Sequence, residues 1–411
     1  MISFIDEPYD QTPVGQRLIF VAQSDNYLQT GFKYVFYVGE IDSYFYIQPN
    51  PSGVGMLDLA PIVRDILKHV KLANQIDVEK ESESVFYTKY VECYEGWLVA
   101  GVFTLNAIKP ARSESKYFWL ANYEVTDGYK PDPRVRYGMC EEEKQYLLSE
   151  RYNETHKWIN ANPSYTNVNK DIFIPTQDIS WGIMYTHEFN SALNGCATDI
   201  KVQVRDSSHA IVSDHLMTLT TDGGINVDAF GIYPENLRAN GFDLTDWAYY
   251  RVTALGDHEE PFSRSYVFYL VNTPCDTPTL RLQWANTVGG VDYFDFTRKK
   301  ELTFDYERKR YQKVIGTYAD SSFTFNTYDR GITERPVIAT KGLQINSDWI
   351  SAGEFTLLQT LILSNDVYIV NTDGSQIPVV VEDTNYICRD ERSGRLWNLS
   401  IKLRYSQAVG L

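Results

Sequence analysis

Histidine and carboxylate side chains are the groups in this chain that could bind a metal or transfer a proton. Two of the six histidines, His209 and His215, lie close in sequence to Asp206 and Asp214. On a pair of strands their separation places all four in a hairpin, so we predict a solvated turn rather than a metal site. The charged loop "GDHEE" (256–260) has no second ligand set at metal spacing and lacks the alternating oxygen ligands of an EF-hand.

The sequence contains no pattern that is typical of a nucleophilic catalyst. It has no G-x-S-x-G turn, and its five cysteines form no C-x-x-C pair. These cysteines are Cys93, Cys140, Cys196, Cys275 and Cys388. The 54 acidic residues always allow some pair at a separation suited to glycoside hydrolysis, so their number does not predict one. We therefore assign no catalytic, cofactor-binding or metal-binding residue, expect no cofactor, and predict that the protein is not an enzyme.

The pair Gly289-Gly290 in "LRLQWANTVGGVDYFDF" (280–296) is the one feature that could form a phosphate-binding loop. Such a loop should lead from a buried strand into a helix, whose N-terminus faces the anion. The residues that follow the pair, "VDYFDFT", have the alternation of a strand. We therefore predict that the two glycines form the corner of a hairpin.

The chain is acidic, with a formal net charge of -16 from 54 acidic and 38 basic residues. Such a surface is poorly suited to neutralise phosphates, so we expect no sequence-specific binding of nucleic acid. The segment "RKKELTFDYERKR" (298–310) is mixed in sign, and we predict a solvated strand pair there. The start "MISFIDEPYDQTP" lacks the basic and apolar regions of a signal peptide, and no apolar stretch is long enough to cross a membrane. Scattered cysteines fit assembly in a reducing cytoplasm.

Short strand-like runs separated by Gly, Pro, Asn and Asp recur along the whole chain, as in "RLIFVAQ" (17–23) and "FKYVFYV" (32–38). This spacing is typical of β-sandwiches and barrels. Helices are predicted at 57–71, with Asp58 as N-cap and Pro61 in the first turn, at 351–364, and more weakly at 141–152. In the first helix Leu59, Ile62, Val63, Ile66, Leu67 and Val70 are expected to share one face. Eight tryptophans are spread evenly, which favours use in cores and interfaces over one sugar-binding platform.

The two halves of the chain repeat one order of elements at low sequence identity. In each half a hairpin is followed by a Gly-containing turn, a short amphipathic segment near Asp58 or Asp228, and two outer strands. The last of these strands contains Phe118-Trp119-Leu120 in the first half and Phe268-Tyr269-Leu270 in the second. We therefore predict a duplicated β-sandwich.

Three domains follow from these patterns. Residues 1–160 are predicted to form a β-sandwich with an inserted helix, residues 161–277 a second sandwich, and residues 278–411 a C-terminal β-rich domain with one helix. The predicted fold class is mainly β, with tandem immunoglobulin/fibronectin-like sandwiches, a few short helices and a C-terminal α+β unit.

Several segments resemble virion proteins of tailed bacteriophages. They include "VFYTKYVECYEGW", "KYFWLANYEV", "LRLQWANTVGGVDYFDFTRKK" and the region from "LSNDVYIVN" to "LSIKLRYSQ". The resemblance lies in style and strand order and implies a non-enzymatic structural component of the tail, baseplate or head-to-tail region. It also implies a homo-oligomer, such as a ring, contacts with other virion proteins, and location in the virion after assembly in the host cytoplasm.

Two alternatives stay open. A peripheral module that binds a host receptor or surface glycan would present a concentrated, exposed aromatic patch. A glycan-degrading enzyme would have two carboxylates facing each other in a cleft. Contact residues are expected in the outer strands and the C-terminal hairpins, but the sequence does not identify them individually.

Overall fold

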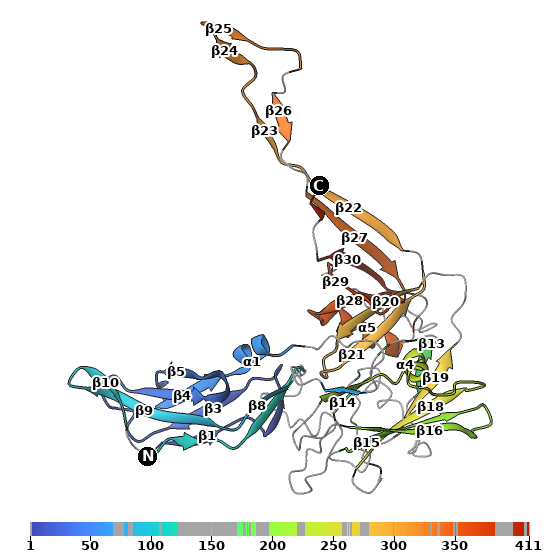
Figure 1. Ribbon diagram of the computed structural model, residues 1–411. Coiled ribbons are helices and arrows are strands. Elements are labelled where there is room, and N and C mark those ends of the chain that lie inside the picture. The colour runs from blue at the N-terminus through green and yellow to red at the C-terminus, as the bar shows by residue number, and fades with distance from the viewer. Residues whose placement is uncertain are drawn as a thin grey trace. The chain divides into compact units, whose positions relative to one another are not determined.

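A computed structural model of the chain consists mostly of antiparallel strands (Figure 1). It describes residues 2–68, 78–80, 85–106, 109–121, 149, 171–175, 178, 180, 182–185, 197–219, 227–256, 261, 263, 265–271, 279–298, 300–328, 331–334, 338–347, 350, 352–382, 398–406 and 409–410. The chain divides into two compact units. The first comprises Met1–Thr273 and Ala285–Asp292, and the second comprises Pro274–Trp284 and Tyr293–Leu411.

The first unit begins with a sandwich of three sheets. One sheet has the order β1 (Ser3–Asp6), β3 (Ile19–Gln23), β6 (Val54–Asp58). The second has the order β10 (Val102–Leu105), β9 (Val91–Val99), β4 (Lys33–Val38), β5 (Ser43–Ile47), with β11 (Ala111–Arg112) also on β9. The third has the order β2 (Gln11–Pro13), β12 (Lys116–Trp119), β8 (Val85–Thr88). Alternate residues of these strands, among them Phe20, Phe36 and Phe118, fill the core between the sheets.

A second sandwich in the same unit has two sheets. The larger has the order β13 (Asp171–Pro175), β19 (Tyr266–Val271), β18 (Tyr249–Leu255), β15 (Asp199–Arg205), β16 (Ile211–Thr218). The smaller has the order β14 (Gly182–Tyr185), β17 (Val227–Phe230), β7 (Val78–Lys80). Its core contains Val202, Ala229, Tyr250 and Phe268, and the ring of Tyr250 stacks on that of Phe268 at 4.9 Å.

Strand pairing follows the same order in the two sandwiches. The hairpin β4-β5 corresponds to β15-β16, the pair β4-β9 to β15-β18, and β3-β6 to β14-β17. In each sandwich an early strand runs parallel to the last one, β2 beside β12 and β13 beside β19. Helices α1 (Ala60–Ile66) and α4 (Pro234–Ala239) follow the equivalent strands β6 and β17, and both have a proline in their first turn. Two sheets joined in this order have the layout of an immunoglobulin-like sandwich.

The described residues of the second unit form one large sheet, the helix α5 (Ala352–Leu363) and two short two-stranded ladders. The sheet has the strand order β21 (Val291–Phe296), β20 (Leu280–Ala285), β28 (Val367–Val370), β29 (Gln376–Val381), β30 (Ser400–Tyr405), β27 (Ile338–Asn346), β22 (Glu301–Glu307), with β31 (Val409–Gly410) on β27. Helix α5 contributes Leu357, Leu358 and Leu361 to the core. The indole N–H of Trp284 donates a hydrogen bond of 2.9 Å to Thr360 Oγ1 in this helix.

Residues 286–290 form the predicted hairpin corner. The N–H of Asn286 donates to the carbonyl of Gly290 at 2.9 Å, and the Asn286 side-chain oxygen accepts from the N–H groups of Val288 and Gly290. Gly289 has φ +101°, and a Cβ there would lie 2.6 Å from the carbonyl oxygen of Leu120. The close approach and the positive φ explain why glycine is needed at this corner.

The helix predicted at 57–71 is shorter than expected. Residues 57 and 58 end strand β6, and the helix ends at Ile66 because Leu67 is extended (ψ 140°) and its side chain enters the core. Ile66, which we placed on the buried face, is 44% exposed. Asp58 caps the first turn through Ala60 N–H at 3.0 Å, although it lies one position before the N-cap.

The remaining fold predictions have different outcomes. The helix predicted at 351–364 is confirmed as α5. Several predictions lie outside the described residues: the helix at 141–152, the end of the first helix at Val70, and the second C-terminal hairpin. The same holds for four of the six histidines, His69, His156, His187 and His258, and for four of the five cysteines. The mainly β class of tandem sandwiches with a C-terminal α+β unit is confirmed. The domain boundary at residue 160 stays a prediction. Within the described part of the chain, no helix has the length and apolarity to cross a membrane.

Candidate assembly surface

A long two-stranded hairpin, residues 301–346, extends from the edge of the second unit's sheet, and we call it the hairpin arm (Figure 1). It begins with β22 and ends with β27. Between them lie two short ladders, β23 (Arg310–Gln312) with β26 (Ile332–Glu334), and β24 (Thr317–Ala319) with β25 (Ser322–Thr324). The described strands of the arm therefore pair in order from β22 and β27 to the tip.

Local sequence explains how the arm turns at its tip. Asp320 and Ser321 connect β24 to β25, and both have positive φ, 50° and 65°. A two-residue hairpin loop of type I′ requires positive φ at both positions, and a right-handed strand twist favours this turn. Gly316 has φ +87°, and a Cβ there would lie 2.5 Å from the Thr324 carbonyl oxygen, so glycine also allows the strands to approach below the tip.

A pair of arginines on one glutamate supports the middle of the arm. Glu334 accepts from Arg310 Nε at 3.0 Å and from Arg308 Nη1 at 3.1 Å. Hydrogen bonding from Arg310 is the main cause that lowers the pKa of Glu334. Because these groups are exposed, the pairs stabilise the ladder only weakly.

Apolar side chains are concentrated on the arm. Eleven of the 29 large hydrophobic side chains that are exposed among the described residues lie between positions 302 and 332. They are Leu302, Phe304, Tyr306, Tyr311, Val314, Ile315, Tyr318, Phe323, Phe325, Tyr328 and Ile332. Scattered exposed hydrophobic residues are ordinary in a soluble protein, but a contiguous group of them marks an interaction surface.

The apolar residues of β22 continue the core face of the sheet. Leu302 lies directly opposite Leu343 of β27, and residues opposite each other in an antiparallel pair share a face. Leu343 belongs to the core under α5, whereas Leu302, Phe304 and Tyr306 are about half exposed. Strand β22 thus presents a core-type surface at a sheet edge.

The tip of the arm has one aromatic face. Tyr318 lies directly opposite Phe323, and alternation places Phe325 on the same side as Phe323. Tyr318 and Phe325 are 70% and 69% exposed. The opposite side of this ladder carries Thr317 and Thr324, so the tip can cover an apolar surface with one face while the other stays polar.

A second exposed aromatic surface lies on the first sandwich, and we call it the tyrosine face. It consists of Tyr37, Tyr44, Tyr46, Tyr94 and Phe103 on the outer side of β4, β5, β9 and β10. The rings of Tyr37 and Tyr44 are 4.6 Å apart, those of Tyr46 and Phe103 are 5.9 Å apart, and the Lys33 ammonium lies 5.7 Å from the Phe103 ring centre. Tyr44 and Tyr46 are 51% and 55% exposed.

Carboxylate contacts fix one side of the tyrosine face. Tyr94 donates to Glu92 at 2.6 Å, and this hydrogen bond is the main cause that raises the pKa of Tyr94 to about 12. Arg112 donates to the same carboxylate at 2.6 Å and lies 3.8 Å from the Tyr90 ring centre. The equivalent face of the second sandwich is mixed: Lys201 and Gln203 both lie 3.3 Å from Asp214, and Leu216 lies opposite Lys201.

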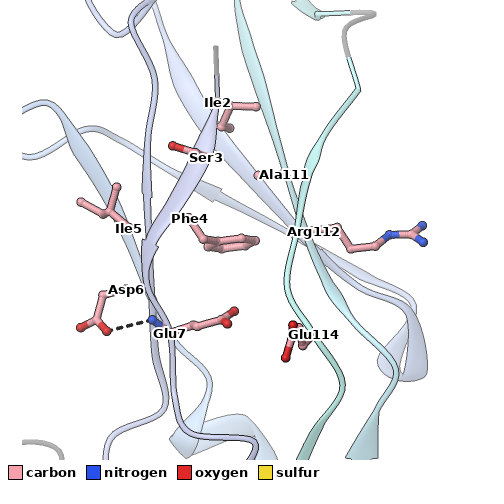
Figure 2. Close-up of a pocket in the computed structure, with 9 residues that line it drawn as sticks. All are labelled: Ile2, Ser3, Phe4, Ile5, Asp6, Glu7, Ala111, Arg112 and Glu114. Carbon is pink, nitrogen blue, oxygen red and sulfur yellow. Dashed lines mark hydrogen bonds between the residues drawn. The ribbon is translucent and has the colours of Figure 1, made fainter.

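A pocket of about 630 Å³ lies between the edge strands β1 and β11 (Figure 2). The ring of Phe4 points into it, and the carboxylates of Glu7 and Glu114 lie at its lower end. Glu7 forms an ion pair of 3.3 Å with the buried Lys116, which also binds Asp10 at 2.8 Å. A buried ammonium group must be paired with carboxylates, and this pairing with Lys116 explains why Glu7 lies at the pocket.

The sequence-predicted metal candidates lie on the β15-β16 hairpin. Asp206 and His209 are in its turn, where Asp206 accepts hydrogen bonds from Ser208 and Ala210, and His209 contacts the hydroxyl of Tyr249 at 2.9 Å. Asp214 and His215 are adjacent on β16 and point to opposite faces. This confirms a hairpin turn, with carboxylate and backbone partners typical of an Asx-turn.

Sequence reasoning missed the hairpin arm. We predicted a solvated strand pair at 298–310, and residues 301–310 are exposed, but the apolar residues of β22 alternate as in a half-buried strand. Two features of the sequence together could have indicated the arm. Leu302, Phe304 and Tyr306 recur at every second position, and the strand-like runs near Gly316 and Gly331 are too short for a sandwich.

Comparison with known proteins identifies no family. No family model and no curated protein matches the chain. Among solved structures, it is similar to the ectodomain of the polymeric Ig receptor of a teleost fish, at 9% identity and a TM-score of 0.16, over 67% of this chain and 100% of that chain. It is also similar to the full extracellular region of plexin A4, at 9% identity and a TM-score of 0.21, over 98% of this chain and 36% of that chain. Scores this low support no inference about function.

Proposed function

We propose that the chain is a non-enzymatic structural component of a tailed-bacteriophage virion, in the tail or its attachment or baseplate region. It acts through protein–protein assembly, in several copies and with other virion proteins. The observation that carries the assembly role is the hairpin arm, whose exposed apolar side chains lie along β22, the edge strand of the second unit's sheet among the described residues, and along the ladders beyond it. The assignment to a phage rests on the resemblance of the sequence segments.

Two other features support an assembly role. The tandem sandwiches supply broad strand faces rich in tyrosine, a residue enriched at protein interfaces. A symmetric assembly repeats each contact in every copy, so individual contacts can be modest. The net charge of -16 suits a surface that stays soluble before assembly and does not adhere to packaged DNA.

Purified virions test the proposal. We expect antibodies against the chain to label one defined zone of the tail in electron micrographs of the phage that encodes it. Mass spectrometry of the same particles should find the chain in a fixed ratio to the other tail proteins. Absence from washed particles, with the chain present in infected cells, would refute the structural role.

A second candidate function has one observation in its favour. The tyrosine face could stack on sugar rings, as expected for a peripheral module that binds a receptor or surface glycan. Titration of the protein with host surface polysaccharide, followed by the NMR signals of the sugar, tests it. Binding that the double variant Tyr44→Ala/Tyr46→Ala removes would support this function, and unchanged binding by the variant would refute the assignment to this face.

A further inference from the structure

We propose that the hairpin arm binds a second copy of this chain, on the acidic body outside the arm. This inference rests on the proposed assembly role and names its partner. Three observations lead to it: the charge of the arm, the one-sided distribution of its aromatic residues, and the charges along β22.

The arm and the rest of the chain have opposite charge. Beyond β22, from Arg308 to Lys341, the arm has seven basic and three acidic residues, whereas the rest of the chain has 31 basic and 51 acidic residues. Opposite potentials attract two surfaces and orient them on approach. The acidic residues of a second copy lie mostly outside its arm, so we expect the arm of one copy to contact that acidic part. Two arms carry charge of the same sign and repel each other.

The shape of the apolar surface indicates what the contact buries. Leu302, Phe304 and Tyr306 lie on one side of β22, and Tyr318 and Phe323 lie together on one side of the tip. A hairpin with such a face lies along a surface and covers it, as an added layer covers the open face of a sheet. Burying each large side chain stabilises the contact by about 1.5–3 kcal/mol before the costs of association.

One two-fold pairing of β22 with its own copy is disfavoured. An antiparallel pair centred on Phe304 would place Glu301 opposite Glu307 of the second copy, and directly opposed like charges destabilise a sheet. This clash, together with the acidic charge outside the arm, favours a contact between the arm and a different surface of the copy. Such head-to-tail contacts close into a ring or continue as a filament.

Molar mass in solution is the first test, measured by light scattering on the full chain over a hundredfold range of concentration. We expect an oligomer that the triple variant Tyr318→Ser/Phe323→Ser/Phe325→Ser shifts to at least about a hundredfold higher concentration. The matched control is Ile211→Ser/Val212→Ser/Leu216→Ser, which removes exposed apolar side chains from β16 and should leave the oligomer unchanged. An oligomer equally stable in the arm variant would overturn the inference.

Cross-linking identifies the partner surface. Chains grown in ¹⁴N and ¹⁵N are mixed, and a carbodiimide joins the Lys313 ammonium to a neighbouring carboxylate without a spacer. We expect mixed-isotope peptides that join Lys313 to a carboxylate outside residues 298–341, and fewer of them as salt rises. Exclusively same-isotope products, or a strict monomer at every concentration, would overturn the inference.

The outcome also separates this inference from the proposed function. If the chain is monomeric and the arm variant is missing from virions that incorporate the wild-type chain, the arm binds a different virion protein and the assembly role stands. If the arm variant is incorporated as well as the wild type, the arm does not carry the assembly role.

Discussion

The corner at Gly289 gives the sharpest stability prediction, for the substitution Gly289→Ala. A φ of +101° is unfavourable for an L-residue, and holding a residue in such a region costs about 1–3 kcal/mol. The new Cβ would also lie 2.6 Å from the Leu120 carbonyl oxygen and 2.9 Å from Trp119 Cδ1, and overpacking of this kind costs about 1–3 kcal/mol. We therefore expect the free energy of unfolding to fall by about 2–6 kcal/mol.

A second glycine separates the two causes. Gly241 has φ +82°, but a Cβ there would meet nothing within 4 Å, so Gly241→Ala should cost only the backbone part, about 1–2 kcal/mol. Urea unfolding followed by circular dichroism measures both variants, with unchanged slopes showing that stability alone has changed. If the two substitutions cost the same, the corner is not closely packed against Leu120 and the reasoning fails.

Three further predictions concern other parts of the structure. Ser321→Gly should stabilise the arm tip by about 0.5–1 kcal/mol, because glycine suits the second position of a type I′ turn, and hydrogen exchange in β24 and β25 should slow accordingly. Burial raises the pKa of Glu92, but hydrogen bonds from Tyr94 and Arg112 outweigh it, so the pKa lies below 4.5. The stability from this group is present above that value and is lost as pH falls through the lowered folded pKa, so Arg112→Gln should flatten the profile of melting temperature against pH below about pH 4.5, measured by calorimetry. Burial raises the pKa of the Cys93 thiol, and peptide mass spectrometry should find it alkylated by iodoacetamide only after unfolding.

Periodicity was enough to predict the sandwiches. Strand alternation places Val202 and Val204 in the core and Lys201 and Gln203 outside, and the order of such strands led to the prediction of a duplication. The four described tryptophans also follow the prediction, since Trp119, Trp247 and Trp284 are buried and Trp97 packs against the first core. The first helix was predicted too long because its apolar period continues through Leu67, which the core accepts in an extended conformation.

The hairpin arm could not be predicted by the same means. Alternation in "ELTFDYE" predicts a strand with one buried face, and it does not say whether that face is covered within the chain. Whether α5 covers the apolar face of β22 depends on how the helix packs on the sheet, which the local sequence does not determine. The tyrosine face has the same origin: Tyr44 and Tyr46 alternate with the core residues Phe45 and Ile47, and both sides of β5 are apolar.

The two sandwiches show where the capacity for assembly can change without loss of the fold. Their inward positions are similarly apolar, whereas the outward positions of the hairpin β4-β5 are rich in tyrosine and those of the hairpin β15-β16 include an ion pair between Lys201 and Asp214. Because successive side chains of a strand point to opposite faces, outward residues can vary while the core is kept. On β22 this separation ends, since Leu302, Phe304 and Tyr306 occupy the inward face beyond the reach of the core under α5. Burying these half-exposed side chains against another molecule would release free energy that folding of the chain alone does not. We therefore expect the arm to be the part of the chain that drives assembly.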